Sequence, residues 1–387
     1  MNNVSEKLQP VPMLDFTRQF ASLRQEILES VTRVFDTQQF ILGPATESFE
    51  QAAAAFCKVP HAAGCSSGTE ALWLALKAAE IGPGDAVITT PFSFFATVSA
   101  ILRAGARPLL ADIDPKTFNL SADAVSREME KNTGSNIKAV LPVHLYGQCA
   151  DWDAFSEIQE RQHVVLIEDA AQAIGATWRD VPAGGLGDLA AFSFYPTKNL
   201  SAAGDAGMVT TKSNTLDERV RMLRAHGMRR RYFHDEIGWN SRIDGVQSAV
   251  LEIKLRYLNE WNAARRRIAA RYDQLLREVK LAASDIKEGL VLPFTDPRAT
   301  HVFHQYTIRA PRRDDLRAYL NFHGIGSEVY YPLPLHQQES LQNLGYRTGD
   351  FPESERAAAE VLSLPIYPEL RDDEQETVVE AIRRFYA

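Results

Sequence analysis

Four short apolar runs constrain the fold of this chain more than any other feature. They occupy residues 86–88, 108–111, 139–143 and 164–167, and a polar or turn residue follows each of them. Segments with helical periodicity lie between the runs. Short strands that are apolar on both faces and alternate with helices are typical of a parallel sheet covered on both sides. We therefore predict an α/β fold with a large, mostly parallel sheet.

Two of the helices can be placed from their periodicity. Thr46 is a predicted N-cap for a helix that carries Phe49 and Phe56 on one face. A second helix bears an apolar stripe that includes Leu72, and it ends before the turn signal at residues 82–85.

The pattern changes near residue 250. The candidates that follow are a long helix from Leu251 into the basic residues 265–267, strands at 306–309 and 329–331, and a last helix at 373–386. We predict a large α/β domain over residues 1–250 and a smaller α+β domain over residues 251–387.

Composition narrows the functional classes. The chain has 387 residues, which is ample for more than one domain, and a formal net charge of -8. An acidic chain without a dominant basic tract binds nucleic acid and anionic membranes poorly, so we expect neither as a partner. Residues 1–13 lack a secretory pattern, and no run approaches the roughly 18 apolar residues of a spanning helix.

The three cysteines, Cys57, Cys65 and Cys149, are scattered along the chain. They form neither a disulfide framework nor a CxxC metal motif, so we predict no metal site. This cysteine usage suits a reducing compartment, and we expect a cytoplasmic protein.

The ends of the apolar runs are the first place to seek a site, because open parallel sheets bind ligands beyond the carboxyl ends of their strands. Glu168 and Asp169 follow one run. A carboxylate there is poorly solvated, so it needs a cationic partner or takes up a proton. Successive strand residues point to opposite faces, so only one of the two acids needs to face a ligand. An ion pair with a neighbouring arginine or lysine is the alternative interpretation.

Small residues begin the helix that carries Leu72. The segment 65–70 (CSSGTE) leaves backbone N–H groups accessible at the helix start, where the helix dipole favours an anion and Thr69 adds a hydroxyl. An ordinary N-cap explains this segment equally well on its own.

One lysine follows a stretch of apolar and aromatic residues. Lys198 lies near the end of the segment 191–199 (AFSFYPTKN). Poor hydration lowers the pKa of a lysine and makes its amine a better nucleophile toward carbonyl groups. Most lysines are solvated surface charges, so this segment alone does not establish catalysis.

Together the three segments meet the demands of one cofactor. Pyridoxal phosphate needs a phosphate cradle, an acid opposite its ring nitrogen and a lysine that forms an imine with its aldehyde. An aromatic face on the ring would complete the pocket. Phe94, which follows another strand end, is the candidate for it, although core packing explains most phenylalanines in that segment.

The ordered motifs of the chain resemble the DegT/DnrJ/EryC1/StrS family of sugar aminotransferases, which are fold-type I pyridoxal phosphate enzymes. The resemblance covers nearly the whole chain. The segments that carry it are 40–44 (FILGP), 67–72 (SGTEAL), 82–85 (GPGD), 143–148 (VHLYGQ), 168–172 (EDAAQ), 193–207 and 362–368 (LSLPIYP).

The resemblance implies roles for the residues above. Lys198 matches the imine-forming lysine, which then moves the proton between cofactor and substrate carbons. Asp169 matches the acid that pairs with the pyridine nitrogen, Gln172 lies near the phenolic oxygen of the ring, and Phe94 stacks on the ring.

The remaining implied contacts concern the cofactor phosphate. Gly68, Thr69 and Ser193 match phosphate contacts within the chain. Asn240 matches an asparagine that reaches the phosphate from the neighbouring subunit, which implies a homodimer with two shared active sites.

The chain departs from the family pattern after the lysine. Many relatives have more glycine in this loop, and Glu-Gly where this chain has Asp205-Ala206. The backbone geometry of this loop can therefore not be predicted from the family pattern, whereas the identity of the lysine is unaffected. Relatives that dehydrate sugars have histidine in place of Lys198, so the resemblance favours amino transfer.

The family reaction implied here moves an amino group from L-glutamate to a keto-sugar carried on a nucleotide diphosphate. Cations should meet the two phosphates. Arg230, in the basic segment 226–234, is a candidate, and a solvated charge run is the alternative. Arg242 lies two residues from Asn240, so it could enter the partner's site and bind a carboxylate.

Three further substrate candidates lie in the C-terminal part. His304, Tyr331 and His336 could contact the sugar or the nucleotide, and for His336 an ordinary hydrogen bond is an equally good interpretation. Residue 172 is glutamine rather than histidine, and in this the chain resembles relatives that aminate the 3-keto position of the sugar. We therefore favour the 3-keto over the 4-keto position.

Two other functions stay open at this stage. A cysteine desulfurase or lyase would use pyridoxal phosphate with a mobile cysteine, and none of the three cysteines lies in an obvious flexible loop. A pyridoxal-phosphate-binding regulator without turnover would need a nucleic-acid module, and no helix-turn-helix pattern precedes residue 40.

Overall fold

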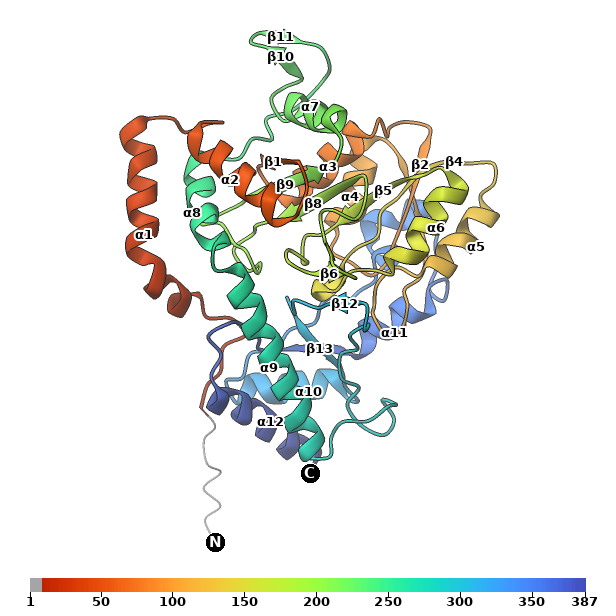
Figure 1. Ribbon diagram of the computed structural model, residues 1–387. Coiled ribbons are helices and arrows are strands. Elements are labelled where there is room, and N and C mark those ends of the chain that lie inside the picture. The colour runs from red at the N-terminus through yellow and green to blue at the C-terminus, as the bar shows by residue number, and fades with distance from the viewer. Residues whose placement is uncertain (1–8) are drawn as a thin grey trace.

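The computed structural model describes residues 9–387. Residues 1–8, with which the predicted large domain begins, lie outside the described residues. The larger part of the protein is built on a seven-stranded sheet (Figure 1). Its strands, in spatial order, are β1 (His61–Cys65), β9 (Gly207–Thr211), β8 (Leu189–Ser193), β5 (Val165–Asp169), β4 (Asn136–Val140), β2 (Asp85–Thr89) and β3 (Arg107–Leu110).

The strand directions confirm the predicted sheet. The five strands from β8 to β3 pair in parallel, and β9 alone in this sheet runs antiparallel to its neighbours β1 and β8. The four apolar runs of the sequence lie in or at the ends of β2, β3, β4 and β5. The carboxyl ends of these strands therefore meet at one edge of the sheet.

Helices cover both faces of the sheet (Figure 1). One face packs on α3 (Gly68–Ala78), α4 (Ala96–Ala104) and α7 (Asn214–Leu223), and the other on α2 (Pro44–Phe56), α5 (Ala122–Lys131), α6 (Trp152–Gln162) and α8 (Gly245–Leu255). Val87 is buried on the face that packs on α3, and its neighbour Ile88 is buried on the opposite face. Because both faces are buried, each strand is apolar throughout.

The start of α2 differs from the prediction. The helix begins at Pro44, and Gly43 precedes it in an extended conformation. Proline suits the first helical position, where its fixed φ is helical and its missing N–H would have no partner. Thr46 therefore lies inside the helix, where its buried hydroxyl is 3.2 Å from that of Ser248.

The predicted long helix from Leu251 is also wrong, because the chain turns at Arg256 and Tyr257. It continues as α9 (Leu258–Glu278), which packs against α12 (Asp372–Tyr386), whereas α8 packs against α2. The start of α9 shares the core of the larger part with α8, and its later turns, from Ile268 on, enter the core of the smaller part. In Figure 1, α9 runs from the larger part down into the smaller one.

The smaller part contains a two-stranded antiparallel sheet of β13 (Tyr306–Arg309) and β14 (Val361–Leu364), with α10 (Arg313–Phe322), α11 (Pro352–Glu360) and α12 around it. The strand predicted at 306–309 and the last helix are confirmed. The strand predicted at 329–331 is wrong: Glu328 makes one isolated bridge to Ser363, and the chain then turns into a cavity.

The cores of the two parts do not divide simply along the chain. Val11 belongs to the buried cluster of the smaller part, with Ile308 and Leu316, and it forms a backbone bridge with Ile325. The first helix, α1 (Phe16–Thr37), packs along α8 at the edge of the larger part (Figure 1). The domain boundary at residue 250 stays a prediction.

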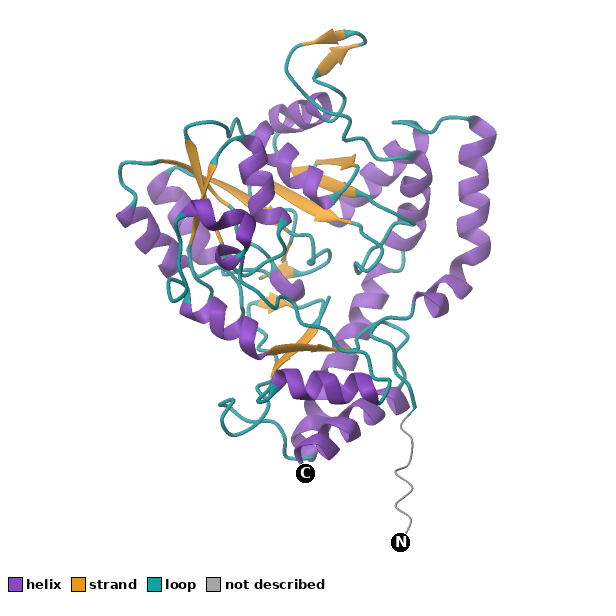
Figure 2. Ribbon diagram, turned by 180° about the vertical axis from the view of Figure 1, so that it is seen from behind, coloured by secondary structure: helices purple, strands orange, loops and turns teal. Residues whose placement is uncertain are grey.

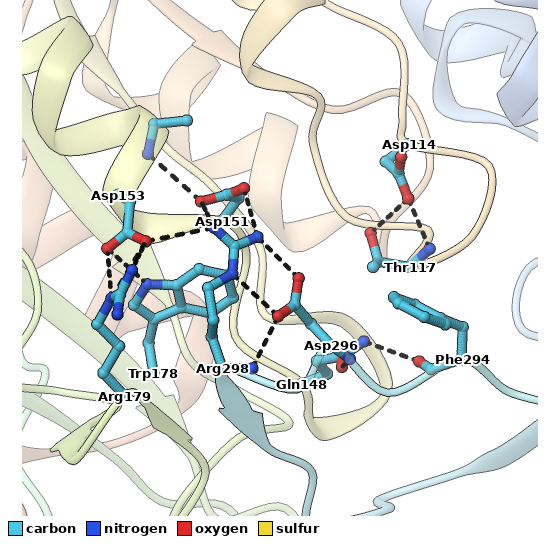
Figure 3. A network of polar contacts seen from close by, with 11 residues as sticks. Asp114, Thr117, Gln148, Asp151, Asp153, Trp178, Arg179, Phe294, Asp296 and Arg298 are labelled. Atoms are coloured by element: carbon cyan, nitrogen blue, oxygen red, sulfur yellow. Dashed lines mark hydrogen bonds and ion pairs between the residues drawn. The ribbon is translucent and has the colours of Figure 1, made fainter.

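An ion-pair network joins the start of α6 to the loop before β12 (Ala299–Thr300) (Figure 3). Arg298 contacts carboxyl oxygens of Asp151 at 2.9 Å, Asp153 at 3.2 Å and Asp296 at 2.8 Å. Its guanidinium lies 4.4 Å from the ring centroid of Trp178 in β6 (Thr177–Trp178), which pairs with β12 and with β7 (Val181–Pro182). The network fixes the chain segment that leads into the smaller part.

A hairpin of β10 (Met228–Arg230) and β11 (Phe233–His234) projects from the body of the protein. Figure 2 shows from behind that it stands clear of the sheet and its helices. None of the helices in the described part of the chain is long and apolar enough to cross a membrane. The cytoplasmic location stays a prediction.

Candidate functional site

A cavity of about 740 Å³ opens at the carboxyl edge of the sheet, between the larger and the smaller part. The residues predicted from the sequence that line it are Gly68, Thr69, Phe94, Asp169, Gln172, Ser193, Lys198, His304 and Tyr331. They come from distant segments of the chain. The fold therefore brings most of the predicted site together where parallel sheets bind ligands.

Asp169, the last residue of β5, lines this cavity with only 4% of its surface exposed. Thr97 donates its hydroxyl to Oδ2 at 2.8 Å, and the Ala171 N–H donates to Oδ1 at 3.2 Å. Burial raises the pKa of the Asp169 carboxyl, and these two donors and the charge of Lys198 oppose that rise. The acid is held in one orientation and is poorly solvated, so it favours a cationic partner in the cavity.

The neighbouring Glu168 has a different environment. Its side chain is fully buried and accepts hydrogen bonds from the backbone N–H groups of Gly184, Leu186 and Gly187 at 2.8 to 2.9 Å. His144 Nε2 lies 3.0 Å from it, and His144 Nδ1 accepts the Ala150 N–H, so Nε2 carries the proton and donates. Glu168 does not line the cavity, which agrees with the expectation that one acid of the pair suffices.

Lys198 lies half-buried in the loop that follows β8. Its backbone N–H donates to Tyr195 O at 2.8 Å, and Phe194 N–H closes the base of the loop on Ala206 O at 2.8 Å. Burial lowers the pKa of the Lys198 amine to about 8, although the charge of Asp169 acts in the opposite direction. The neutral, nucleophilic amine is thus far more populated near neutral pH than in a solvated lysine. The loop is closed despite its low glycine content, with Asp205 on the cavity wall.

The start of α3 forms a close-packed cradle beside Ser193. The Ser67 hydroxyl caps the helix by accepting the Glu70 N–H at 3.2 Å. A Cβ atom on Gly68 would lie 2.6 Å from the Cβ atom of Ser193, so only glycine fits there. Within the described part of the chain, the N–H groups of Gly68 and Thr69 have no hydrogen-bond acceptor. Free N–H groups at a helix start suit an anion.

Gln172 is fixed in the opposite wall. Its Oε1 accepts the Tyr146 N–H at 2.7 Å, and its Nε2 lies 3.1 Å from the Tyr331 hydroxyl. Phe94 is 60% exposed, and its ring centroid lies 6.2 Å from that of Tyr331. An aromatic side chain that keeps so much exposed surface beside a cavity is free to stack on a ligand.

His304 lines the cavity as a neutral imidazole, because burial and the charge of Lys198 lower its pKa well below the usual value. Asn199 Oδ1 lies 3.1 Å from His304 Nδ1. The amide of Asn199 is oriented by its Nδ2, which donates to Asn262 and to the Val302 carbonyl. Nδ1 of His304 is therefore the protonated nitrogen, and Nε2 offers a lone pair.

Four predicted site residues do not line this cavity. Arg230 lies on the exposed hairpin, with its guanidinium 3.6 Å from the ring centroid of Phe233. Asn240 is exposed and accepts from Arg242 Nε at 3.0 Å. His336 is buried away from this cavity, and its Nε2 lies 2.9 Å from Glu355 Oε1. The roles of all four stay predictions.

Several cavity residues were missed by the sequence reasoning. They are Ser67, Thr97, Tyr195, Thr197, Asp205, Gln305, Glu328 and Tyr330. Thr97 had a signal, since it follows the predicted Phe94 by less than one helical turn. Gln305 had one too, as the neighbour of His304, and its buried Oε1 has no hydrogen-bond partner in the part of the chain described.

The arrangement suits one kind of chemistry. A lysine with a lowered pKa attacks an aldehyde, a helix start with free N–H groups binds a phosphate, and a buried acid stabilises a protonated ring nitrogen. Pyridoxal phosphate carries all three of these groups. Fold and site together define a transferase that depends on pyridoxal phosphate.

The whole sequence narrows this class to one family. Residues 21–383 match the model of the DegT/DnrJ/EryC1/StrS aminotransferase family, and the chain belongs to this family. This match confirms the predicted family. It also confirms the predicted amino transfer and the predicted cofactor, pyridoxal phosphate.

Similar proteins cover nearly the whole chain. A pleiotropic regulatory protein of Geobacillus stearothermophilus is 47% identical over 376 residues, which are 97% of this chain and 98% of that protein. A UDP-N-acetyl-3-dehydro-alpha-D-glucosamine 3-aminotransferase of Acidithiobacillus ferrooxidans is 40% identical over 374 residues, 97% of each chain. The crystal structure of S. venezuelae DesV in complex with a ketimine intermediate has a TM-score of 0.92 and 40% identity, with 97% of this chain and 98% of that chain covered.

The residues of this chain fit the cofactor. The Gly68 backbone, whose missing side chain makes room beside Ser193, would hold the phosphate with Thr69. Asp169, kept in place by Thr97, would pair with the ring nitrogen, and Lys198 would hold the cofactor covalently and move the proton at the reacting carbon. When bound, the cofactor supplies a reactive aldehyde and an electron-accepting ring.

Proposed function

We propose that the protein transfers an amino group from L-glutamate to the 3-keto position of a sugar carried on a nucleotide diphosphate. The observation that carries the proposal is the single cavity that holds both Lys198 and Asp169 at the carboxyl edge of the sheet. Its volume of about 740 Å³ suits a cofactor together with a sugar. The substrate class is supported by the 3-aminotransferase relative, which is named for a UDP-linked 3-dehydro sugar.

The preference for the 3-keto position depends on Gln172. Its amide is oriented from both ends by Tyr146 and Tyr331, so it presents a fixed neutral group to the cavity. A histidine there could change its charge near neutral pH, whereas an amide cannot. The preference itself rests on the likeness of Gln172 to relatives that aminate the 3-keto position.

We further propose that two copies of the chain share their active sites. The charged side chains on the cavity wall are Lys198, Asp169, Asp205 and Glu328, and Glu328 is paired with Arg317 at 2.6 Å. Both substrates are anionic, so this wall alone would bind them poorly. Arg230, Asn240 and Arg242 lie outside their own cavity, on the surface around the projecting hairpin. A second copy would bring Arg230 and Arg242 as cations and Asn240 as a neutral donor, so the expected assembly is a homodimer.

The substrate proposal is tested with a panel of nucleotide-linked keto-sugars. The purified protein is incubated with pyridoxal phosphate, L-glutamate and each sugar, and mass spectrometry detects the amino-sugar. We expect amination of at least one 3-keto sugar and little of its 4-keto isomer. Amination of 4-keto sugars alone would overturn the preference that rests on Gln172.

The shared site is tested by mixing two inactive variants. Lys198→Ala lacks the catalytic amine but keeps Asn240, whereas Asn240→Ala keeps the amine but lacks the asparagine. Co-refolded mixtures should recover up to about a quarter of wild-type activity, because half of the dimers are mixed and each contains one intact site. No recovery in dimers shown to have exchanged chains would mean that each site is self-contained.

The alternative of a cysteine desulfurase lacks a nucleophile in this structure. All three cysteines are buried, and burial raises the pKa of Cys57 and of Cys65 to about 12. Such thiols are protonated and inaccessible. The alternative of a regulator without turnover draws on the name of the 47% identical relative. A protein that binds pyridoxal phosphate and aminates no sugar of the panel would favour it.

A further inference from the structure

We propose that Glu70 is a positioning residue that couples the two active sites of the dimer. It fastens the segment 240–242, which serves the partner's site, to the phosphate cradle of its own site. The inference rests on the proposed shared site. Four sets of contacts carry it.

Backbone contacts place the segment against the cradle. The Ser66 N–H donates to the Ser241 carbonyl at 3.1 Å, and Cys65 and Arg242 form an antiparallel bridge. Ser66 and Cys65 immediately precede the residues of the helix start. Any shift of the segment would therefore disturb the end of β1 and the N-cap of α3.

The side chain of Ser241 is directed to the cradle, whereas its neighbours are not. Ser241 is fully buried, and its hydroxyl donates to Glu70 Oε2. Asn240 is exposed and Arg242 is half-buried, and they are joined by their own hydrogen bond of 3.0 Å. The buried serine thus anchors the two flanking residues that are proposed to reach the partner's site.

The hydrogen-bond partners of the Glu70 carboxylate are unusual for its position in the helix. A serine N-cap followed by glutamate three residues later is the capping-box pattern, in which the glutamate accepts the N–H of the cap residue. Only half of that box is present here: Ser67 accepts the Glu70 N–H, while the Glu70 carboxylate accepts from Ser241 and from Arg103. The acid contacts the segment 240–242 instead of closing its own helix start.

Arg103 and two tryptophans complete the clamp. Arg103 pairs with Glu70, and its guanidinium lies 4.7 Å from the ring centroid of Trp73 and 5.3 Å from that of Trp239. The two indole rings meet edge to face at 6.2 Å. Trp239 directly precedes Asn240, so the clamp holds the segment through Trp239 as well as through the buried serine. It also neutralises an acid that would otherwise repel a phosphate at the start of α3.

The consequence concerns the site in the other subunit. Loss of the Glu70–Ser241 hydrogen bond frees Asn240 and Arg242, whose partners lie across the dimer. The affinity for the anionic substrate should fall at the partner's site, and the hold on the cofactor phosphate, which Asn240 is proposed to contact, should weaken as well. A purely local role for Glu70 would instead affect its own subunit.

The test places Glu70→Gln in one chain of the mixed dimer described above. That dimer has one working site, made of the lysine of the Asn240→Ala chain and the segment 240–242 of the Lys198→Ala chain. Glu70→Gln on the Lys198→Ala chain removes the negative charge that Ser241 and Arg103 share, so at saturating pyridoxal phosphate it should raise the KM for the nucleotide keto-sugar about tenfold, with kcat unchanged. The same substitution on the Asn240→Ala chain should change KM by less than about twofold.

Two further variants keep the test decisive. Ser241→Ala on the Lys198→Ala chain abolishes this hydrogen bond, so it should raise KM at least as much, and adding Glu70→Gln to it should raise KM little further. It also replaces Glu70→Gln if that variant fails to assemble. Glu252→Gln is the matched control, since Glu252 accepts from Ser48 at 2.7 Å away from the cavity, and KM should not change.

The outcomes separate this inference from the proposed function. An inactive parent dimer would overturn the shared site and the coupling with it. An active parent dimer whose KM is the same with and without Glu70→Gln or Ser241→Ala on the Lys198→Ala chain would overturn the coupling alone.

Discussion

At the scale of single residues, the chemistry of this site depends on how two adjacent acids are surrounded. Glu168 receives hydrogen bonds from three backbone N–H groups and from His144. Asp169 receives two and keeps contact with the cavity. Because successive strand residues point to opposite faces, Glu168 is held in the interior while Asp169 faces the cavity. Thr97 also belongs to the site, because its hydroxyl orients Asp169.

Replacement of Asp169 tests its role. Asp169→Asn keeps the shape and can still accept from Thr97, but it cannot stabilise a protonated ring nitrogen by charge. We expect kcat to fall by at least about 100-fold, with the melting temperature little changed. Thr97→Val, which removes only the 2.8 Å hydrogen bond to Asp169, should lower kcat by about tenfold. Steady-state kinetics would contradict this role if both variants kept wild-type kcat.

The pKa of Lys198 predicts how the protein without cofactor captures pyridoxal phosphate. Only the neutral amine attacks the aldehyde, and its pKa is lowered to about 8. The capture rate should therefore rise with pH and level off above about pH 8. Stopped-flow absorption from pH 6 to pH 10.5 measures it. A rate that still climbs steeply at pH 10 would show an ordinary solvated lysine.

The same pKa has a consequence for stability. A lysine with a lowered pKa in the folded state binds fewer protons there than in the unfolded chain between about pH 8 and 10.5. The free energy of unfolding of the protein without cofactor should rise with pH across this window. Lys198→Met removes the titrating group and should flatten that dependence in urea unfolding curves. The effect is moderate because the side chain is only half-buried.

At the scale of elements, the network around Arg298 fixes the loop that leads into the smaller part (Figure 3). Arg298→Met leaves three carboxylates without their common partner. We expect the free energy of unfolding to fall by about 1–2 kcal/mol at low salt and by less at high salt. Arg383→Met, which removes an exposed pair with Glu380, is the control and should have no measurable effect. Equal urea midpoints for both variants would contradict a stabilising network.

Local pattern predicted some elements and missed others for identifiable reasons. The parallel strands were found because burial on both faces makes them apolar throughout. The segment 329–331 was mistaken for a strand because aromatic residues that line a cavity resemble residues of a sheet. α1 was missed: its apolar residues Phe20, Leu28 and Phe35 stay exposed in one chain, beside the buried Leu23 and Ile27.

The site was predicted to a similar extent. Lys198, Asp169 and the start of α3 line one cavity as expected, because each lies in a local motif with its own chemical logic, and their roles stay predictions. Gln305 and Glu328 were missed, since only the packing of the smaller part brings them to the cavity. In the proposed dimer, a second chain would set the positions of Arg230 and Asn240 relative to a substrate, and no local pattern encodes that arrangement.

At the scale of the whole molecule, the exposed apolar face of α1 fits the proposed dimer. Leu28 is 41% exposed and Phe35 54% exposed on one side of this helix. The double variant Leu28→Glu/Phe35→Glu places charges on that face and should shift the protein toward monomers in sedimentation experiments. Activity should fall with the dimer fraction, because each cavity then lacks the partner's cations. A fully active monomer would contradict shared sites.

The central claim is that Lys198 binds the cofactor covalently opposite Asp169. The most direct measurement is the visible absorption spectrum of the purified wild type and of Lys198→Ala after incubation with pyridoxal phosphate and removal of the excess. The wild type should show the absorption band of the lysine-linked cofactor, and Lys198→Ala should lack it while retaining the fold by circular dichroism. The same band in both proteins would show that another group holds the cofactor.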